Sequence, residues 1–232
     1  MLKEAGPARP RAGGGGDDVF VLPASFAQER MWFLERMAGG SAAYNMPVAL
    51  RLRGTLDPRA LTAALAGIVR RHEVLRTTLP TLRGELVQVV RPSGPARWPL
   101  ADLSALDGEA REREGLRLRR EVARRRFDLA RGPLLRAVLV RMAADEHVAL
   151  CTLHHAVCDG WSREVLAREL GAGYAAALEG RPSPLPPLRL QYGDFARWQR
   201  RWLEGEACAR QLACWRGRLA GAPPAPELPA DR

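Results

Sequence analysis

The fold is decided by the stretch His154-His155-Ala156-Val157-Cys158-Asp159-Gly160-Trp161-Ser162. The run before it, residues 148–153, is almost entirely apolar, and apolar side chains recur at helical spacing after it. This pattern predicts a turn between a buried strand and a helix. Ser162 is a candidate N-cap of that helix, whose positive end would point back at the imidazoles and stabilise a negative charge that develops there.

The two adjacent histidines are expected to have different roles. Neighbouring side chains of an extended backbone point to opposite sides, so one imidazole faces a cavity while the other packs behind it. An imidazole is a natural proton acceptor near neutral pH. Asp159 is close enough to orient the turn or to pair with an arginine, and Gly160 leaves room for a substrate backbone.

Two other interpretations compete with a catalytic one. A histidine after a buried strand is commonly a core residue whose hydrogen bonds are satisfied. The pattern C-x-x-H-H-x-x-C, formed by Cys151, His154, His155 and Cys158, raises the alternative of a metal site. Because Cys151 lies inside the strand and structural zinc sites favour C-x-x-C knuckles, no metal is predicted here.

The stretch resembles the HHxxxDG signature of the condensation domains of non-ribosomal peptide synthetases, which have the chloramphenicol acetyltransferase-like fold. Three further stretches are similar to that family in the same order, namely Ser25–Leu34, Arg71–Thr77 and Tyr192–Trp198. The resemblance runs from about Val19 to the end of the chain. Residues 41–47 are most similar to the subtype that joins two L-configured residues.

The resemblance implies roles for individual residues. His155 is implied to accept or position the proton of an attacking amine. The residues implied to support it are His154, Asp159, Gly160 and Arg76. The candidates for contact with the substrate channel are Tyr44, Asn45, Trp161 and Ser162. Arg76 is implied to point toward the active centre and could pair with Asp159, and an ordinary surface arginine is the alternative.

The activity implied by the resemblance is amide formation by an acyltransferase. A donor acyl or peptidyl thioester and an acceptor aminoacyl thioester would arrive on the phosphopantetheine arms of two carrier proteins, so no cofactor of the chain itself is expected. The alternative is a non-catalytic remnant or a docking module for a carrier protein, and an epimerase relative stays open. The intact set of His154, His155, Asp159 and Gly160 favours the acyltransferase.

Other parts of the chain carry their own structural signals. Asp57-Pro58 is typical of a helix start, and His72 lies on the apolar stripe of that helix, where a structural role is expected. The predicted strands are residues 48–52, 86–90, 134–140 and 148–153, the last two as a hairpin; helices are predicted at 108–126 and around Phe195, Trp198 and Trp202. This order predicts an α/β sandwich with a mixed sheet and flanking helices.

The chain is expected to comprise one lobe of the family's fold and part of a second. Residues 1–18, rich in Pro and Gly, are predicted to be a disordered leader. Residues 19–180 are expected to form the N-terminal lobe, and 181–232 the linker and the truncated start of the second lobe, whose motifs are not found. The chain alone is therefore expected to be inactive.

The composition of the chain indicates which binding partners and which cellular location to expect. The chain has 36 Lys and Arg against 26 Asp and Glu, a net charge of +10, but the arginines are interleaved with glutamates and form no stripe with aromatic residues. Nucleic acid is therefore not an expected partner. The four cysteines form no disulfide framework, and no apolar run approaches the roughly 20 residues of a membrane span. We expect a cytoplasmic protein with no membrane partner.

Overall fold

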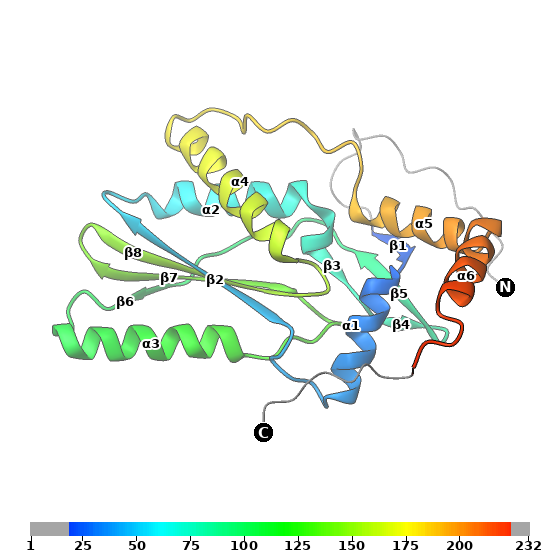
Figure 1. Cartoon of the computed structure of the whole chain (residues 1–232). Helices are drawn as coiled ribbons and strands as arrows, with labels where there is room; N and C mark the ends of the chain where they lie inside the picture. Colours follow the sequence, from blue (N-terminus) through cyan, green and yellow to red (C-terminus); the bar gives the residue numbers. More distant parts are fainter. Residues whose placement is uncertain (1–18, 224–232) are drawn as a thin grey trace, which may run out of the picture.

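The computed structural model describes residues 19–223. Its elements, in chain order, are β1 (Phe20–Pro23), α1 (Phe26–Met37), β2 (Asn45–Arg53), α2 (Pro58–Arg71), the 3₁₀ turn η1 (Glu73–Arg76), β3 (Thr77–Thr78), β4 (Thr81–Leu82), β5 (Glu85–Val90), β6 (Leu100–Asp102), α3 (Gly108–Arg124), β7 (Leu135–Ala143), β8 (Glu146–His154), α4 (Gly160–Leu178), α5 (Tyr192–Leu203) and α6 (Glu206–Arg218). Figure 1 shows a large sheet covered by α2 and α4 on one face and by α3 on the other.

The large sheet has the strand order β2-β8-β7-β6. β8 pairs antiparallel with both β2 and β7, and β6 runs parallel to β7, so the sheet is mixed. The predicted hairpin of residues 134–153 is confirmed as β7 and β8. The predicted fold class, an α/β sandwich with a mixed sheet and flanking helices, is confirmed.

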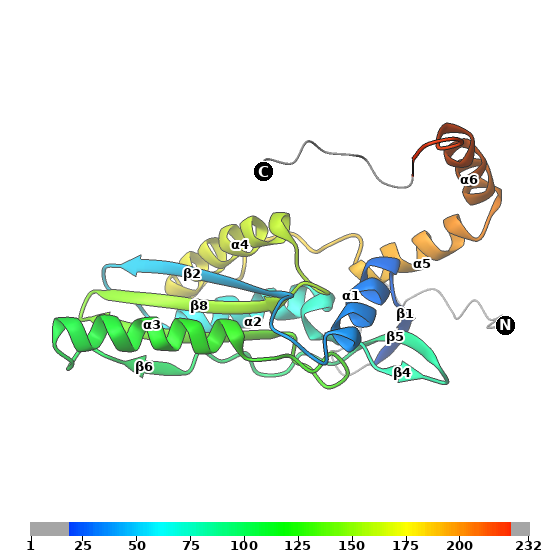
Figure 2. The ribbon, with the colours of Figure 1, turned by 60° about the horizontal axis from the view of Figure 1, so that its bottom comes forward.

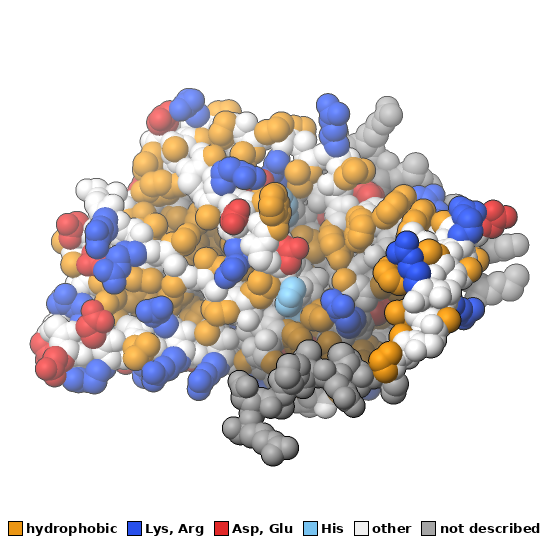
Figure 3. Space-filling model, in the orientation of Figure 1, with side chains coloured by type: hydrophobic (Ala, Val, Ile, Leu, Met, Phe, Trp, Pro, Cys, Tyr) orange, Lys and Arg blue, Asp and Glu red, His pale blue; other side chains and the backbone are white. Residues whose placement is uncertain are grey.

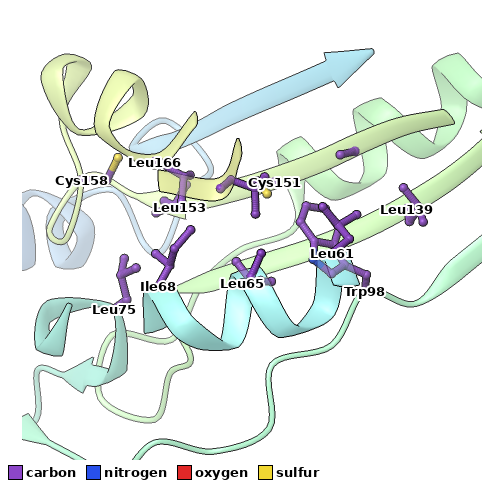
Figure 4. Packing of buried hydrophobic residues seen from close by; sticks show 13 residues of the cluster. Leu61, Leu65, Ile68, Leu75, Trp98, Leu139, Cys151, Leu153, Cys158 and Leu166 are labelled. Atoms are coloured by element: carbon purple, nitrogen blue, oxygen red, sulfur yellow. The ribbon is translucent and has the colours of Figure 1, made fainter. Parts of the chain in front are cut away.

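The strand β8 is buried on both faces. Ala149, Cys151 and Leu153 belong to the core between the sheet and the helices α2 and α4, where Leu61, Leu65 and Ile68 of α2 point at the sheet (Figure 4). Val148 and Leu150 pack with the side chains of α3 on the opposite face. Burial on both faces explains why the run before the histidines is nearly all apolar rather than alternating.

A second, smaller sheet holds the N-terminal strand. It has the order β1-β5-β3, with β4 also paired to β5, and these pairs are antiparallel. Its strand β5 contains the predicted strand 86–90, whereas β1, β3 and β4 were not predicted. Figures 1 and 2 show this sheet beside α1 and α5, at the end of the molecule opposite to the turn that joins β7 and β8.

Of the two N-cap residues predicted from the sequence, one is confirmed and one is wrong. Asp57 is the N-cap of α2, as predicted, and its Oδ1 accepts the N–H groups of Arg59 (2.7 Å) and Ala60 (3.2 Å). The N-cap of α4 is Asp159, so the prediction of Ser162 is wrong. The helix begins immediately after the turn, and this places Ser162 in its first turn, where it completes a capping box with Asp159.

The segment that follows α4 leads to two further helices. Residues 181–191 contain no helix or strand, and α5 and α6 come after them; the division of the chain into two lobes at this point stays a prediction. The proposed leader 1–18 and the tail from residue 224 lie outside the described residues. Within residues 19–223, every helix is too short or too polar to cross a membrane.

Candidate active site

The histidine turn is anchored to both neighbours of β8. The N–H of His154 donates to the Leu134 carbonyl (3.0 Å), and the N–H of His155 donates to the Tyr44 carbonyl (2.8 Å). The Val157 N–H then closes the turn on the carbonyl of His154 (3.0 Å). The backbone of the turn is thereby held in place, and the imidazole directions follow from it.

The two imidazoles point to opposite sides, as predicted. The His154 side chain is only 1 % exposed, whereas His155 is an exposed residue. Figure 3 shows a histidine open to solvent in the middle of the face that carries α4. His155 can therefore meet a substrate, and His154 packs behind it.

Hydrogen bonds fix the proton position on His154. The backbone N–H of Ala156 donates to Nδ1 (3.0 Å), so Nδ1 must carry a lone pair. The proton therefore lies on Nε2, which donates to Oε1 of Glu35 (3.1 Å). Burial lowers the pKa of His154, and the hydrogen bond to Glu35 opposes this effect without cancelling it. His154 is a neutral, structural imidazole.

The proton on His155 has the opposite position. Nδ1 lies 2.9 Å from the carbonyl oxygen of Cys158, and a carbonyl can only accept. Nδ1 therefore donates, and in the neutral ring Nε2 keeps the free lone pair. An exposed residue whose ring has one nitrogen held by the backbone and a lone pair on the other has the arrangement of a general base.

Asp159 and Gly160 shape the turn from its other side. Oδ1 of Asp159 accepts the N–H (2.8 Å) and the hydroxyl (2.6 Å) of Ser162, whose hydroxyl oxygen accepts the Asp159 N–H (3.2 Å). The hydrogen bonds to Ser162 lower the pKa of Asp159. A Cβ added to Gly160 would meet no atom within 4 Å. Asp159 therefore orients the turn, and space beside Gly160 is open.

The structure gives Arg76 and Asn45 other partners. The Arg76 guanidinium contacts the Arg91 carbonyl and the Glu73 carboxylate, whereas the Asp159 carboxylate is used by Ser162. Among the ion pairs that the structure gives for residues 19–223, none joins Arg76 to Asp159. Asn45 Nδ2 donates to carbonyl oxygens at the end of α3, those of Ala123 (2.7 Å) and Arg125 (3.0 Å). A contact of Asn45 or Arg76 with substrate stays a prediction.

The remaining channel candidates lie on two sides of the turn. The Tyr44 ring lies 6.4 Å from the ring of His154, on the buried side. Trp161, 77 % exposed, and Ser162 line a cavity of about 230 Å³ between α2, η1 and the start of α4. The cavity wall is largely apolar and includes Cys158 and His72. His72 itself is a structural residue, as predicted, because its Nε2 lies 2.7 Å from the buried Glu169.

The cysteines beside the histidines are poor metal ligands. Burial raises the pKa of the Cys151 thiol to about 12 and that of Cys158 to about 11, so both thiols stay protonated near neutral pH. No group of three or more His, Cys, Asp or Glu in residues 19–223 is arranged to hold a metal ion. The ring nitrogens of His154 and the Nδ1 of His155 form hydrogen bonds within the protein instead.

Sequence reasoning missed two residues of α1 that contact the turn. Glu35 bonds His154, and Gln28 Nε2 lies 3.5 Å from the Ala156 carbonyl and 3.2 Å from Gln88 Oε1. Both are buried polar residues. They lie seven positions apart in the sequence and therefore on one face of the helix, a spacing that could have marked a buried polar face.

The family model for the condensation domain matches residues 20–232. The chain belongs to the condensation domain family. Among curated relatives, this condensation domain chain is 47 % identical over 211 residues to chondramide synthase cmdD of Chondromyces crocatus, covering 91 % of the chain and 5 % of that protein. It is 44 % identical over 226 residues to phosphinothricin tripeptide synthetase PhsC of Streptomyces viridochromogenes, covering 97 % of the chain and 20 % of that protein. The chain thus spans a small part of the length of these two relatives.

Solved structures of similar proteins agree with the fold of this condensation domain chain. The X-domain from teicoplanin biosynthesis is 35 % identical with a TM-score of 0.77, over 90 % of this chain and 46 % of that one. The starter condensation domain of rhizomide synthetase RzmA has a TM-score of 0.78 at 22 % identity, over 88 % of this chain and 49 % of that one, and supports the fold alone. The chain covers about half of each of these two solved structures.

Proposed function

We propose that this chain supplies the proton-handling half of an acyltransferase that forms amide bonds between two carrier-bound thioesters. The amine of an acceptor aminoacyl thioester attacks the carbonyl carbon of a donor acyl or peptidyl thioester. The C–N bond forms, the C–S bond breaks, the donor's arm leaves as a thiol, and the amine nitrogen loses a proton. His155 accepts or positions that proton, with His154, Asp159 and Gly160 supporting the turn.

The observation that carries the proposal is the exposed imidazole of His155, whose Nδ1 is held by the backbone. The hydrogen bond from Nδ1 to the Cys158 carbonyl keeps the lone pair on Nε2, which is the nitrogen directed away from that backbone contact. The N-terminus of α4 lies directly after the turn. Its partial positive charge would stabilise negative charge on the thioester oxygen as the carbonyl carbon is attacked.

Magnitudes limit what His155 has to supply. An α-amino group has a pKa of about 7.7 to 8.0, so on the order of a tenth of it is already neutral at pH 7. General-base assistance of about 10²- to 10⁴-fold is thus an upper bound for the imidazole. Holding the two reacting arms together can supply roughly 7 to 11 kcal/mol, so orientation is the larger contribution.

The partners follow from the proposed reaction and from the exposed surface. Two carrier proteins would bring the substrates on phosphopantetheine arms, and a second half of the fold would complete the channel. The aromatic side chains along α5 and α6 support such a half, since Trp198 is 52 % and Trp215 is 56 % exposed. Figure 3 shows hydrophobic side chains over this end of the molecule, as expected for an interface. A preference for two L-configured residues is part of the proposal.

The test is amide formation by this chain supplied with a second half of a condensation domain and two loaded carrier proteins. The product is measured by mass spectrometry for wild type, His155→Ala and the control Arg131→Ala, whose side chain is 88 % exposed. The expected result is a loss of about 10²- to 10⁴-fold for His155→Ala and none for the control. Undiminished product from His155→Ala would overturn the role of His155.

A docking module is the second candidate function. The X-domain from teicoplanin biosynthesis, 36 % identical to this chain in its complex with OxyB, is a member of the same fold bound to another protein. On this alternative the chain binds a carrier protein without chemistry. Binding of a carrier protein that is unchanged by its acyl group, together with no turnover in the assay above, would favour it.

A further inference from the structure

The carboxylate of Glu35 occupies an unusual place for a charged group. Its side chain is only 10 % exposed, and it lies near the C-terminal end of α1, where the helix dipole disfavours a negative charge. Neither burial nor helix stability explains this residue. The explanation has to come from what its two oxygens contact.

Both oxygens accept a hydrogen bond from a fixed donor. Oε1 accepts from Nε2 of His154 (3.1 Å), and Oε2 accepts from the backbone N–H of Ser41 (3.2 Å). Neither donor can reverse its role, because the Ala156 N–H holds the proton of His154 on Nε2 and a backbone N–H only donates. The site therefore requires a group that accepts on both sides, which a carboxylate does and a carboxamide does not.

The same contacts join Glu35 to both sides of His155. His154 precedes it in the chain. Ser41 begins the segment that leads to Tyr44, whose carbonyl accepts the N–H of His155 (2.8 Å). Figures 1 and 2 show α1 at the end of the large sheet, where β2 begins and β8 ends. Movement of the Glu35 carboxylate would thus shift both backbone supports of His155.

We propose that Glu35 is a positioning residue for the proton transfer at His155. It acts through His154 and the segment from Ser41 to Tyr44, and it does not touch the substrate. The inference rests on the proposed function, since it names what aims the imidazole that handles the amine proton. Gln28, on the same face of α1, adds a weaker contact to the Ala156 carbonyl at 3.5 Å.

The test compares Glu35→Gln with Glu169→Gln. Glu169 is a matched control because it is also a buried glutamate that bonds a histidine, His72, and it contacts Arg71 through its other oxygen (3.1 Å). We expect Glu35→Gln to lower kcat for amide formation by up to about 100-fold, the cost of misplacing a reacting group by about 1 Å, without changing KM for the loaded carriers. The control is expected to lose stability and keep its rate.

Histidine NMR on this chain provides a readout that does not depend on activity. A carboxamide must turn its NH₂ toward one of the two donors, so Glu35→Gln should shift the ring ¹⁵N signals of His154 and of His155, while Glu169→Gln should leave both unchanged. If the proposed function fails, turnover is absent throughout and the spectra still test the positioning. Unchanged His154 and His155 spectra for Glu35→Gln would overturn the inference, with or without turnover.

A second variant keeps the test decisive if Glu35→Gln does not fold. Glu35→Asp retains a group that accepts on both sides but withdraws it by one methylene. Its rate and its His154 signals are expected to lie between those of wild type and those of a chain without the carboxylate contact. A rate and spectrum identical to wild type for Glu35→Asp would overturn the inference, because a carboxylate withdrawn by one methylene could not keep both contacts that position His155.

Discussion

Replacing each of the adjacent histidines by alanine should separate stability from chemistry. His154→Ala removes a buried ring that accepts from the Ala156 N–H and donates to Glu35, leaving two buried polar groups without their partner. His155→Ala removes an exposed ring with one hydrogen bond to a carbonyl. Neighbours in sequence should therefore differ in nearly every measurable effect.

The magnitudes follow from the burial and from the hydrogen bonds. Each buried polar group that loses its partner costs about 1–3 kcal/mol, and the empty space left by the ring adds to this. We expect His154→Ala to lower the free energy of unfolding by roughly 3–5 kcal/mol, a large share of the 5–15 kcal/mol typical of a domain. His155→Ala should lower it by less than about 1 kcal/mol, because the site is exposed.

Urea denaturation followed by circular dichroism measures both effects. With an m-value of about 3 kcal/mol/M, His154→Ala should lower the midpoint by roughly 1–1.7 M, and His155→Ala should shift it by about 0.3 M or less. Equal losses for the two variants would refute the opposite placement of the two rings. So would a His154→Ala chain as stable as wild type.

Three further predictions concern the same turn. Asp159→Ala removes the N-cap of α4 and should lower the free energy of unfolding by about 1 kcal/mol, which corresponds to a decrease in Tm of about 2–4 °C. Asp159→Asn should retain most of the capping interaction, and thermal melts of the two variants test the difference. Burial places the folded-state pKa of His154 below its ordinary value of 6.5, so below that pH the unfolded chain binds more protons than the folded chain. The free energy of unfolding should therefore be unaffected by His154 titration above pH 6.5 and should decrease as the pH falls below it. Tm measured between about pH 8 and pH 5 tests this, and His154→Ala should show a smaller decline. Iodoacetamide should alkylate the exposed Cys214 of the native chain well before the buried Cys151 and Cys158, whose pKa values burial raises to about 12 and about 11; equal rates would contradict their burial.

Much of the fold could be predicted because its signals are local. The nearly unbroken apolar run 148–153 predicts β8, since a strand covered on both faces needs apolar side chains at each position. Asp57-Pro58 predicts the start of α2 from the chemistry of the cap alone. The strand β1, at Phe20–Pro23, was missed because four residues ending in proline carry too short a pattern to distinguish from a loop.

The parts of the site that could not be predicted depend on contacts distant in sequence. The histidine turn and the opposite directions of its rings follow from local spacing. Glu35 is 119 residues from His154, and a glutamate in a helix ordinarily faces water. Its spacing from Gln28 could mark a shared face of the helix, but nothing local identifies His154 as its partner. Ser162 and Asp159 are both good caps, and the choice between them depends on where the turn ends.

The most direct test of this account is the position of the proton on each histidine of the turn. In ¹⁵N-histidine NMR of the chain near neutral pH, His155 is predicted to carry its proton on Nδ1 with Nε2 free, and His154 to carry it on Nε2. A neutral His155 protonated on Nε2 would have its lone pair on Nδ1, which faces the Cys158 carbonyl and not the substrate, and would contradict the account.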